Sequence, residues 1–419
     1  MSKLVIKGGK PLTGTVKING AKNSAVAIVA ASVLFKGKTV LENIPQISDI
    51  LILLGIMEKM GATVEWLEDD VVAIEIPDDF AVAARYEEVR SLRASNLLLG
   101  SLLGRKGQAL VSLPGGCDLG QRPMDLHIKG FVKLGAEVET NMEEGYITAS
   151  TSGLTGSFIY LDFPSVGATE NIMMAAALAE GLTVIENVAK EPEIVDLANF
   201  LNNGGAKIRG AGTDIIKIEG VPELIGPRYS IIPDRIEAGT FMAIAAMNQG
   251  NLKLENVISA HLNPVIAKMR EAGVTVRPNG SDIFVKAPQE LKAVDIKTLA
   301  HPGFPTDMQP QMMSVLSVAN GTSTIVENLF ENRMKAAPEL IKMGADITVE
   351  GVTATIKGVA ELHGASVTAK DLRAGAALVA AALAASGETE VNGLSYIDRG
   401  YWHMAEKLQE IGADVERVD

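Results

Sequence analysis

The sequence predicts an α/β protein of two domains, in which six βαβαββ repeats place their helices inside and their sheets outside. Two glycine markers that share one period carry this prediction. The first marker, a glycine followed by Ala or Val between an apparent helix and a strand, recurs at intervals of 74, 70, 68, 71 and 68 residues. It occurs at Gly61, Gly135, Gly205, Gly273, Gly344 and Gly412. The second marker opens a strand at Gly37, Gly107, Gly181, Gly250, Gly321 and Gly387.

The first repeat shows the elements of this unit in order. A helix rich in Ala, Val and Ile is expected over 24–35, and the marker glycine after it is a typical helix end. A strand follows over 39–41, and an amphipathic helix follows over 51–60. Alternating apolar and polar side chains over 63–66 and 71–76 then predict a β-hairpin.

The first helices of the repeats are apolar nearly all round, as over 374–386, which predicts that they are buried. Three repeats can close one globular domain around three such helices. Pro222, Gly226 and Pro227 interrupt the chain after the third repeat. We therefore expect one domain over 21–229 and a second over 1–20 and 230–419.

Composition narrows the class of protein. Of 419 residues, 47% are apolar and 21% charged, which excludes a small module or a disordered chain. The net charge of −13 argues against nucleic acid or an anionic membrane surface as partners. One cysteine permits no internal disulfide, and no apolar run reaches the roughly 18 residues of a membrane span. We expect a soluble cytoplasmic protein without a signal peptide.

Basic residues recur where the helices of the repeats are expected to begin. Lys22, Arg93 and Arg373 precede or open first helices, while Arg122 and Arg399 accompany second helices. A cation at the positive end of a helix dipole is unfavourable, so the recurrence suggests an anionic ligand, phosphate or carboxylate, in a cleft that these residues share. The alternative is a set of solvated surface charges.

Three further residues are candidates for chemistry or positioning. Cys117 lies in a loop with three glycines and is either a reactive thiol or a small apolar filler. His127 is expected to be a hydrogen-bonded positioning residue. Asp307 has no basic neighbour within two residues and is either a proton acceptor or an ordinary N-cap. The motifs GxxxxGK(S/T), HExxH, CxxC and GxSxG are absent, so NTP hydrolysis, zinc chemistry and serine hydrolysis are unsupported, and we expect no metal.

Nine segments spread over the chain closely resemble the UDP-N-acetylglucosamine enolpyruvyl transferases of the EPSP synthase family. They are GAKNSAVAI (20–28), LRAS (92–95), LPGGCDLGQRPMDLHIKG (113–130), SVGATENIMMAA (165–176), EPEIVDLANFL (191–201), IIPDRIEAGTF (231–241), HPGFPTDMQPQ (301–311), DLRAGAALV (371–379) and IDRGY (397–401). The resemblance implies an inside-out α/β barrel in each of two domains. It also implies transfer of the enolpyruvyl group of phosphoenolpyruvate to the 3′-hydroxyl of UDP-N-acetylglucosamine, with release of phosphate and no cofactor. This reaction is the first committed step of peptidoglycan synthesis, on which cell-wall biogenesis, cell shape and cell division depend.

The resemblance also implies roles for individual residues. Lys22 and Asn23 are expected to contact phosphoenolpyruvate, and Lys22, Arg122, Arg373 and Arg399 to stabilise its phosphate and carboxylate charge. The expected contacts of the UDP sugar are Arg93, Arg122, Pro123, Met124, Asp125, Leu126, Asp307 and Leu329, with Val166 and Gly167 near the diphosphate. Asp307 is expected to take the hydroxyl proton. Cys117 is expected to protonate C3 of phosphoenolpyruvate and to be alkylated by fosfomycin.

Three expectations remain open at this point. The loop over 112–122 is expected to close over the substrate, because its glycines allow it to move. One alternative function is that of the sister enzyme, a 3-phosphoshikimate 1-carboxyvinyltransferase. The other is a non-catalytic scaffold that binds sugar nucleotides.

Overall fold

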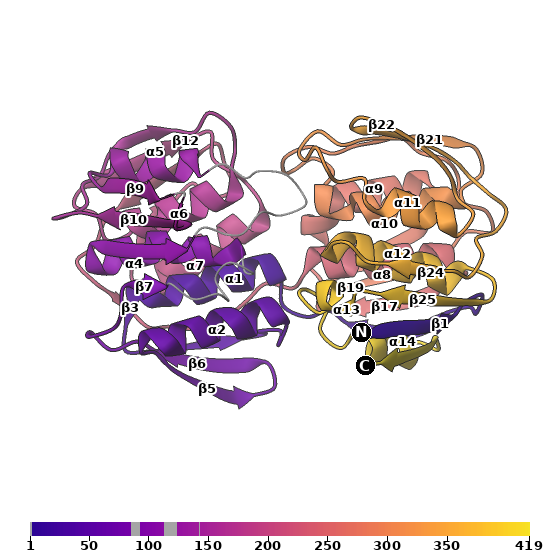
Figure 1. Cartoon of the computed structure of the whole chain (residues 1–419), viewed down its shortest axis with the longest axis horizontal. Helices are drawn as coiled ribbons and strands as arrows, with labels where there is room; N and C mark the ends of the chain where they lie inside the picture. Colours follow the sequence, from indigo (N-terminus) through magenta and orange to yellow (C-terminus); the bar gives the residue numbers. More distant parts are fainter. Residues whose placement is uncertain (1, 85–92, 113–123, 142) are drawn as a thin grey trace. The chain divides into compact units, whose positions relative to one another are not determined.

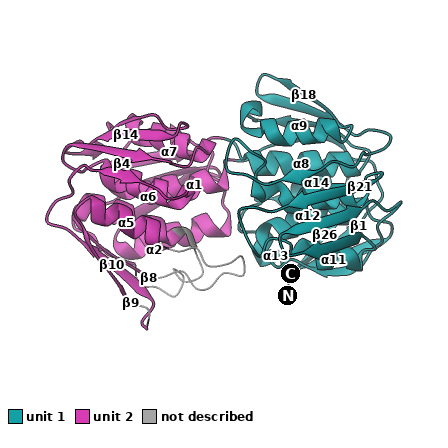
Figure 2. Ribbon diagram, turned by 90° about the horizontal axis from the view of Figure 1, so that it is seen from above, with its two compact units in different colours: residues 1–19, 118–120, 233–419 teal, residues 20–117, 121–232 magenta. Residues whose placement is uncertain are grey.

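The computed structural model describes residues 2–84, 93–112, 124–141 and 143–419. Contacts among these residues group into two units (Figure 2). Described residues up to Asn19 and from Pro233 onward form unit 1, and those between Gly20 and Ile232 form unit 2.

Among the described residues, each unit contains three four-stranded sheets of one common topology (Figure 1). An edge strand runs parallel to its neighbour, and the other two pairings are antiparallel. In spatial order, the sheets of unit 2 are β16 (Arg228–Ser230), β4 (Lys38–Glu42), β6 (Val71–Glu75) and β5 (Thr63–Glu68); β7 (Ala83–Ala84), β8 (Gln108–Ser112), β10 (Tyr146–Ser150) and β9 (Glu137–Asn141); and β11 (Phe158–Tyr160), β12 (Leu182–Glu186), β14 (Ile215–Glu219) and β13 (Lys207–Arg209). Those of unit 1 are β2 (Thr13–Lys17), β17 (Asn251–Glu255), β19 (Asp282–Lys286) and β18 (Thr275–Asn279); β20 (Ile296–Lys297), β21 (Thr322–Val326), β23 (Thr353–Lys357) and β22 (Asp346–Glu350); and β24 (Ser366–Thr368), β25 (Glu388–Asn392), β1 (Lys3–Lys7) and β26 (Asp414–Val418).

The first helix of each repeat lies in the interior of its unit, inside the sheets (Figure 1). In α12 every residue from Arg373 to Leu383 is buried, which is why this helix is apolar on all sides. The interior helices are α1 (Lys22–Ala31), α4 (Leu98–Lys106) and α6 (Val166–Ala176) in unit 2, and α8 (Arg235–Met247), α10 (Gln309–Ser317) and α12 (Leu372–Ala384) in unit 1. The predicted fold, with three repeats per unit, helices inside and sheets outside, is confirmed.

The other helices are shorter or amphipathic. They are α2 (Ser48–Met60), α5 (Asp125–Lys133), α7 (Pro192–Asn203), α9 (Asn263–Glu271), α11 (Ala336–Lys342), α13 (Leu394–Ile397) and α14 (Met404–Glu410), with 3-10 turns η1 (Ser32–Leu34), η2 (Arg93–Leu97), η3 (Ser259–Leu262) and η4 (Thr306–Met308). Across the described ranges, no helix combines the length and the apolar character that a bilayer crossing requires.

The glycine markers work through backbone conformation. All six glycines of the first marker have positive φ, between 92° and 113°. Gly61, for example, caps α2 in the left-handed conformation, which a residue with a Cβ adopts only at a cost. Five of the six glycines of the second marker also have positive φ. The exception is the fourth repeat, where Gln249, with φ 49°, is the left-handed residue in place of Gly250.

The predicted helix over 24–35 is too long. The α-helix α1 ends at Ala31, η1 follows, and Phe35 begins the short strand β3 (Phe35–Lys36). β3 pairs in parallel with β15 (Leu224–Ile225), where Phe35 lies opposite Leu224. This pairing, between residues far apart in the sequence, overrides the local helical pattern.

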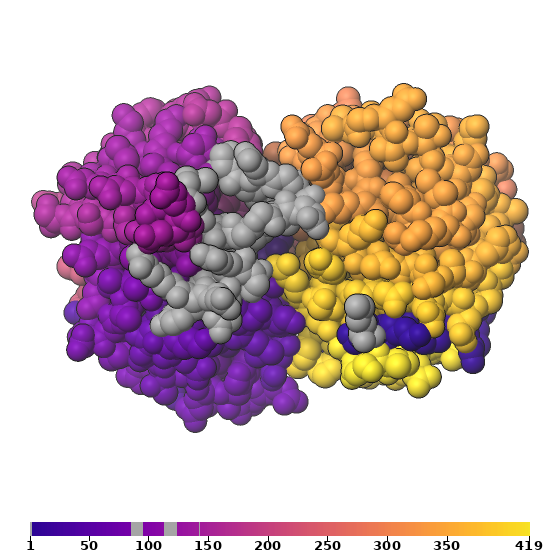
Figure 3. Space-filling model, viewed as in Figure 1, coloured from indigo at the N-terminus to yellow at the C-terminus, as the bar shows by residue number. Residues whose placement is uncertain are grey.

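The two N-terminal strands belong to sheets of unit 1. β1 lies between β25 and β26, with Lys3 opposite both Asn392 and Val418. Figure 3 shows this indigo segment at the surface among yellow C-terminal residues. β2 completes the sheet of β17 by parallel pairing.

Candidate active site

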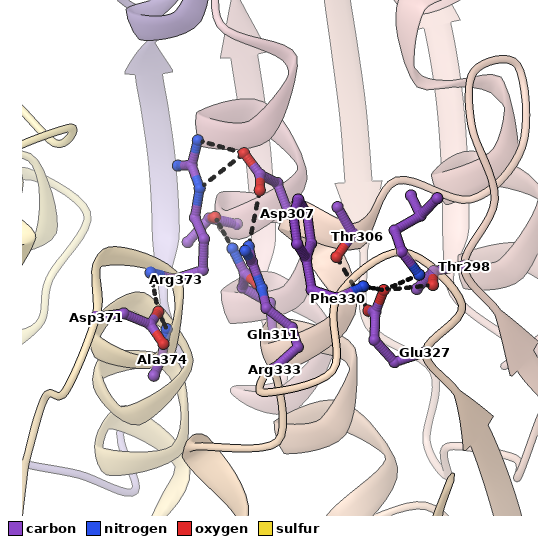
Figure 4. A network of polar contacts seen from close by, with 12 residues as sticks. Thr298, Thr306, Asp307, Gln311, Glu327, Phe330, Arg333, Asp371, Arg373 and Ala374 are labelled. Atoms are coloured by element: carbon purple, nitrogen blue, oxygen red, sulfur yellow. Dashed lines mark hydrogen bonds and ion pairs between the residues drawn. The ribbon is translucent and has the colours of Figure 1, made fainter. Parts of the chain in front are cut away.

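Asp307 is partly buried and lies between two arginines in unit 1 (Figure 4). Its Oδ1 accepts a hydrogen bond from Nη2 of Arg333 at 2.7 Å. Its Oδ2 accepts from Nη2 of Arg373 at 2.9 Å and from Nε at 3.2 Å. The two arginine side chains are only 2% and 5% exposed. The site is therefore a partly exposed carboxylate, held by three charge-assisted hydrogen bonds from two buried arginines.

These arginines control the basicity of Asp307. Burial alone would raise its pKa, but the charges of Arg373 and Arg333 outweigh burial and hold the pKa of Asp307 well below its usual range. Burial likewise opposes the charge on Arg373, and Asp307 nevertheless keeps the pKa of Arg373 above its ordinary value. Asp307 is thus an anion and a weak base in this arrangement. Moving either arginine away from Asp307 would raise the pKa of Asp307 again.

Arg373 is fixed by the start of α12. Asp371 caps this helix, because its Oδ1 accepts from the backbone N–H groups of Arg373 at 2.9 Å and Ala374 at 2.8 Å. Nη1 of Arg373 lies 3.4 Å from the hydroxyl of Tyr401, which in turn lies 2.8 Å from Oγ1 of Thr240. Arg373 is therefore held both at its backbone N–H and at its guanidinium group.

Two other predicted residues of unit 1 occupy different settings. Leu329 is 39% exposed, and its backbone N–H donates to Oε1 of Glu327 at 2.9 Å. Arg399, which we expected to accompany a second helix, lies in the turn between α13 and α14.

Lys22, in unit 2, is the first residue of α1, as the sequence predicts, and is followed by Asn23. Its Nζ lies 2.9 Å from Oδ2 of Asp49, which belongs to the first turn of α2. The two side chains are 15% and 3% exposed. Asp49 therefore offsets the unfavourable position of a cation at a helix N-terminus.

A buried carboxylate fixes the start of α1. Asp196 accepts hydrogen bonds from the hydroxyls of Ser24 and Tyr229, the latter at 2.5 Å, and from the backbone N–H of Ile232 at 3.3 Å. Burial raises the pKa of Asp196, and these hydrogen bonds oppose the rise. The first turn of α1, with Lys22, is thus tied to the last residue of unit 2.

The predicted positioning residue His127 lies in a polar cluster of α5 and α6. Oδ1 of Asn171 accepts from the N–H of Gly100 at 2.8 Å, so its amide nitrogen faces Nδ1 of His127 at 2.9 Å. Gly167 lies directly beside the ring, since a Cβ there would stand 3.3 Å from Cε1 of His127. Nδ1 therefore accepts a hydrogen bond from the Asn171 amide, so it carries no proton and the imidazole is neutral.

Other predicted residues lie around this cluster. Val166 opens α6, with Ser165 as its N-cap. Met124 precedes α5 and lies 3.5 Å from the Asn96 amide through its sulfur. Asp125 and Leu126 begin α5, exposed and buried respectively.

Burial lowers the pKa of His127 from 6.5 to about 4, against the opposing charge of Asp125. Because the unfolded chain binds a proton near pH 6.5 and the folded chain does not, we expect stability to fall as pH drops below 6.5 and to level off near pH 4. The total loss is on the order of 3 kcal/mol. Chemical unfolding of the wild type and of His127→Gln, which retains an acceptor, should diverge over this pH range. Parallel pH profiles would contradict the assignment of a neutral imidazole.

Some predicted residues lie outside the described ranges. These are Cys117, Arg122, Pro123 and nearly all of the predicted lid over 112–122. For Arg93 the structure gives the backbone, which begins η2. Within the described ranges, no group of three or more His, Cys, Asp or Glu side chains is arranged to hold a metal ion.

Arg333, Glu327, Asp49 and Asn171 are absent from the sequence prediction. Arg333 approaches Asp307 from 26 residues away and carries no local signature. Only Glu327 had a usable signal, because it departs from the residues at the matching position of the other repeats.

Known proteins match this sequence over nearly its whole length. The family model described as EPSP synthase (3-phosphoshikimate 1-carboxyvinyltransferase) matches residues 6–408. A UDP-N-acetylglucosamine 1-carboxyvinyltransferase 1 of Caldanaerobacter subterraneus is 54% identical over 99% of both chains. A UDP-N-acetylglucosamine 1-carboxyvinyltransferase 2 of Carboxydothermus hydrogenoformans is 54% identical over the full length of both.

Two solved structures share the fold of this chain. The enolpyruvyl transferase NikO from Streptomyces tendae has a TM-score of 0.89 at 25% identity, covering 100% of this chain and 99% of that one. EPSP synthase from Acinetobacter baumannii, at 21% identity and a TM-score of 0.78 over the full length of both chains, shows the same fold. The chain therefore belongs to the EPSP synthase family and, within it, groups with the UDP-N-acetylglucosamine 1-carboxyvinyltransferases.

Proposed function

We propose that the protein transfers the enolpyruvyl group of phosphoenolpyruvate to the 3′-hydroxyl of UDP-N-acetylglucosamine and releases phosphate. The observation that carries the proposal is the 54% identity, over essentially the whole chain, to relatives that bear the name of this activity. The two buried arginines beside Asp307 support it, because guanidinium groups can bind the phosphate and carboxylate of an anionic substrate.

The proposed chemistry is addition followed by elimination. Asp307 takes the proton of the sugar hydroxyl while the oxygen of that hydroxyl bonds to C2 of phosphoenolpyruvate. Cys117 delivers a proton to C3. Loss of a proton from C3 then expels phosphate from C2 and restores the double bond. Lys22, Arg122, Arg373 and Arg399 stabilise the phosphate and carboxylate charges, each with a charge-assisted contact.

The remaining predicted residues are proposed to hold the substrates. Asn23 would contact phosphoenolpyruvate. The UDP sugar would be held by Arg93, Arg122, Pro123, Met124, Asp125, Leu126, Val166, Gly167, Asp307 and Leu329. The reaction would supply peptidoglycan synthesis in the cytoplasm, which the single cysteine of the chain favours.

Phosphate release from phosphoenolpyruvate tests this function directly. Release should require UDP-N-acetylglucosamine, and 3-phosphoshikimate should not replace it as the acceptor. Fosfomycin should stop the reaction by alkylating Cys117. Release that depends on 3-phosphoshikimate would favour the sister activity, and binding of the sugar nucleotide without release would indicate a scaffold.

Asp49→Asn tests the ion pair that holds Lys22. Removing the charge leaves Lys22 less well placed to bind phosphoenolpyruvate, so the KM for phosphoenolpyruvate should rise about tenfold with a smaller effect on kcat. Initial rates at saturating UDP-N-acetylglucosamine measure both constants. Asp162→Asn is a suitable control, because it removes an exposed ion pair with Lys129 in the same unit. Equal kinetics of the two variants would contradict the role of Asp49.

A further inference from the structure

Glu327 is a carboxylate with 1% exposure that accepts four hydrogen bonds in unit 1 (Figure 4). Its Oε1 accepts from the hydroxyl of Thr298 at 2.8 Å and from the backbone N–H groups of Leu329 at 2.9 Å and Phe330 at 3.2 Å. Its Oε2 accepts from the hydroxyl of Thr306 at 3.0 Å. One side chain thus joins the end of β20, the segment before Asp307 and the segment after β21.

The other repeats show that the fold does not require a carboxylate here. Six residues after the second-marker glycine, four described repeats carry Asn43, Asn187, Asn256 and Gly393, all with positive φ. Glu327 stands at this position in the fifth repeat and lacks the positive φ.

The hydrogen bond that the asparagines make at this position in other repeats does not depend on Glu327 in the fifth repeat. The amide nitrogens of Asn43, Asn187 and Asn256 each donate to a backbone carbonyl beside the parallel edge strand, at 2.8 Å. Asn328, one residue after Glu327, makes the matching bond to the carbonyl of Thr298 at 3.0 Å. The carboxylate of Glu327 is therefore an addition to the repeat.

This addition reaches the proposed catalytic carboxylate by two routes. Thr306, bound to Oε2, immediately precedes Asp307. Phe330, whose N–H binds Oε1, places its ring 5.7 Å from Cζ of Arg333, and Arg333 pairs with Asp307. Oε1 also holds the N–H of Leu329, a proposed contact of the sugar nucleotide.

We infer that Glu327 is a positioning residue, which fixes the separation between Asp307 and the Leu329 segment so that a sugar held at one is presented to the other. The inference rests on the proposed function. A purely structural role would instead make Glu327 matter for folding alone.

Two threonine variants separate these roles. Thr298 and Thr306 both donate to the Glu327 carboxylate, but only Thr306 adjoins Asp307. Thr298 also accepts from the N–H of Asn328 at 2.9 Å, so Thr298→Val removes more hydrogen bonds than Thr306→Val. A structural role therefore predicts the larger defect for Thr298→Val, in thermal stability and in activity together.

The positioning role predicts the opposite order in the kinetics. Thr306→Val should lower kcat about tenfold, since small displacements of a reacting group are costly, while the KM for UDP-N-acetylglucosamine changes less than about twofold. Thr298→Val should keep kcat within roughly threefold of the wild type although its melting temperature falls at least as far. Phosphate release and thermal unfolding of both purified variants give these values.

Substitutions of Glu327 provide the second measurement. Glu327→Gln can accept the three bonds at one atom and donate to Thr306 from the other, so it should retain kcat within roughly threefold. Glu327→Asn, the residue of other repeats, is too short to reach Thr306. It should lower kcat about tenfold, as Thr306→Val should.

The outcomes distinguish the two proposals. No phosphate release by the wild type would overturn the proposed function. Normal release by the wild type, with equal kcat for Thr306→Val and Thr298→Val, would overturn the positioning role alone. Equal losses in Glu327→Gln and Glu327→Asn would also overturn it, because charge rather than placement would then be responsible.

Discussion

Replacement of Asp307 by Asn should lower the rate of phosphate release by about 10²–10⁴, the usual contribution of a positioned proton acceptor. An amide has nearly the shape of the carboxylate but cannot take the proton of the sugar hydroxyl. Single-turnover release at saturating phosphoenolpyruvate and UDP-N-acetylglucosamine measures the chemical step. Turnover at the wild-type rate would exclude Asp307 as the base.

The same substitution should also destabilise unit 1. Arg333 and Arg373 are both buried and would lose their negative partner, an arrangement that typically costs about 3–5 kcal/mol. Activity must therefore be compared at a temperature where thermal unfolding shows the variant to be folded. Asp295→Asn, at an exposed carboxylate of the same unit that binds the N–H of Thr324, is the matched control and should behave as the wild type.

The second large effect is expected at Cys117. Cys117→Ser should reduce turnover by at least about 10²-fold, because a thiol with a pKa near 8.5 donates a proton readily and an alcohol does not. Binding of UDP-N-acetylglucosamine, measured by calorimetry, should persist. Fosfomycin should add one covalent label to the wild type and none to the variant, as read by mass spectrometry.

The control for this prediction is a small described residue of unit 2. Ser101→Ala removes a hydroxyl from the buried face of α4 and should leave both turnover and labelling unchanged. Wild-type turnover in Cys117→Ser would remove the thiol from the mechanism. Labelling of that variant would place the alkylated atom on another residue.

The fold was predictable because its signals are local and repeated. A glycine is required where a helix ends in the left-handed conformation, and all six glycines of the first marker have it. Burial on all sides also leaves a local mark, as in the apolar sequence of α12. The end of α1 was not predictable, since β3 forms through pairing with β15, whose residues come from the other end of unit 2.

The candidate site was predictable only in part. Lys22 and Arg373 could be found because they recur at helix starts. The partners of Asp307 could not, since Arg333 and Arg373 reach it from 26 and 66 residues away and no spacing rule relates them. No basic residue lies within two positions of Asp307 in the sequence, yet two arginines contact it in the structure. The sequence around Asp307 therefore does not indicate its basic surroundings.

The pairing of β1 sets an order on how the chain can fold during synthesis. β1 (Lys3–Lys7) pairs with residues 388–392 of β25 and 414–418 of β26. It therefore leaves the ribosome long before the other strands of its sheet are made. All described residues of unit 2 are made in the interval. Since chains grow at about 5–20 residues per second, the first strand waits on the order of tens of seconds, with its backbone unpaired and open to capture by chaperones.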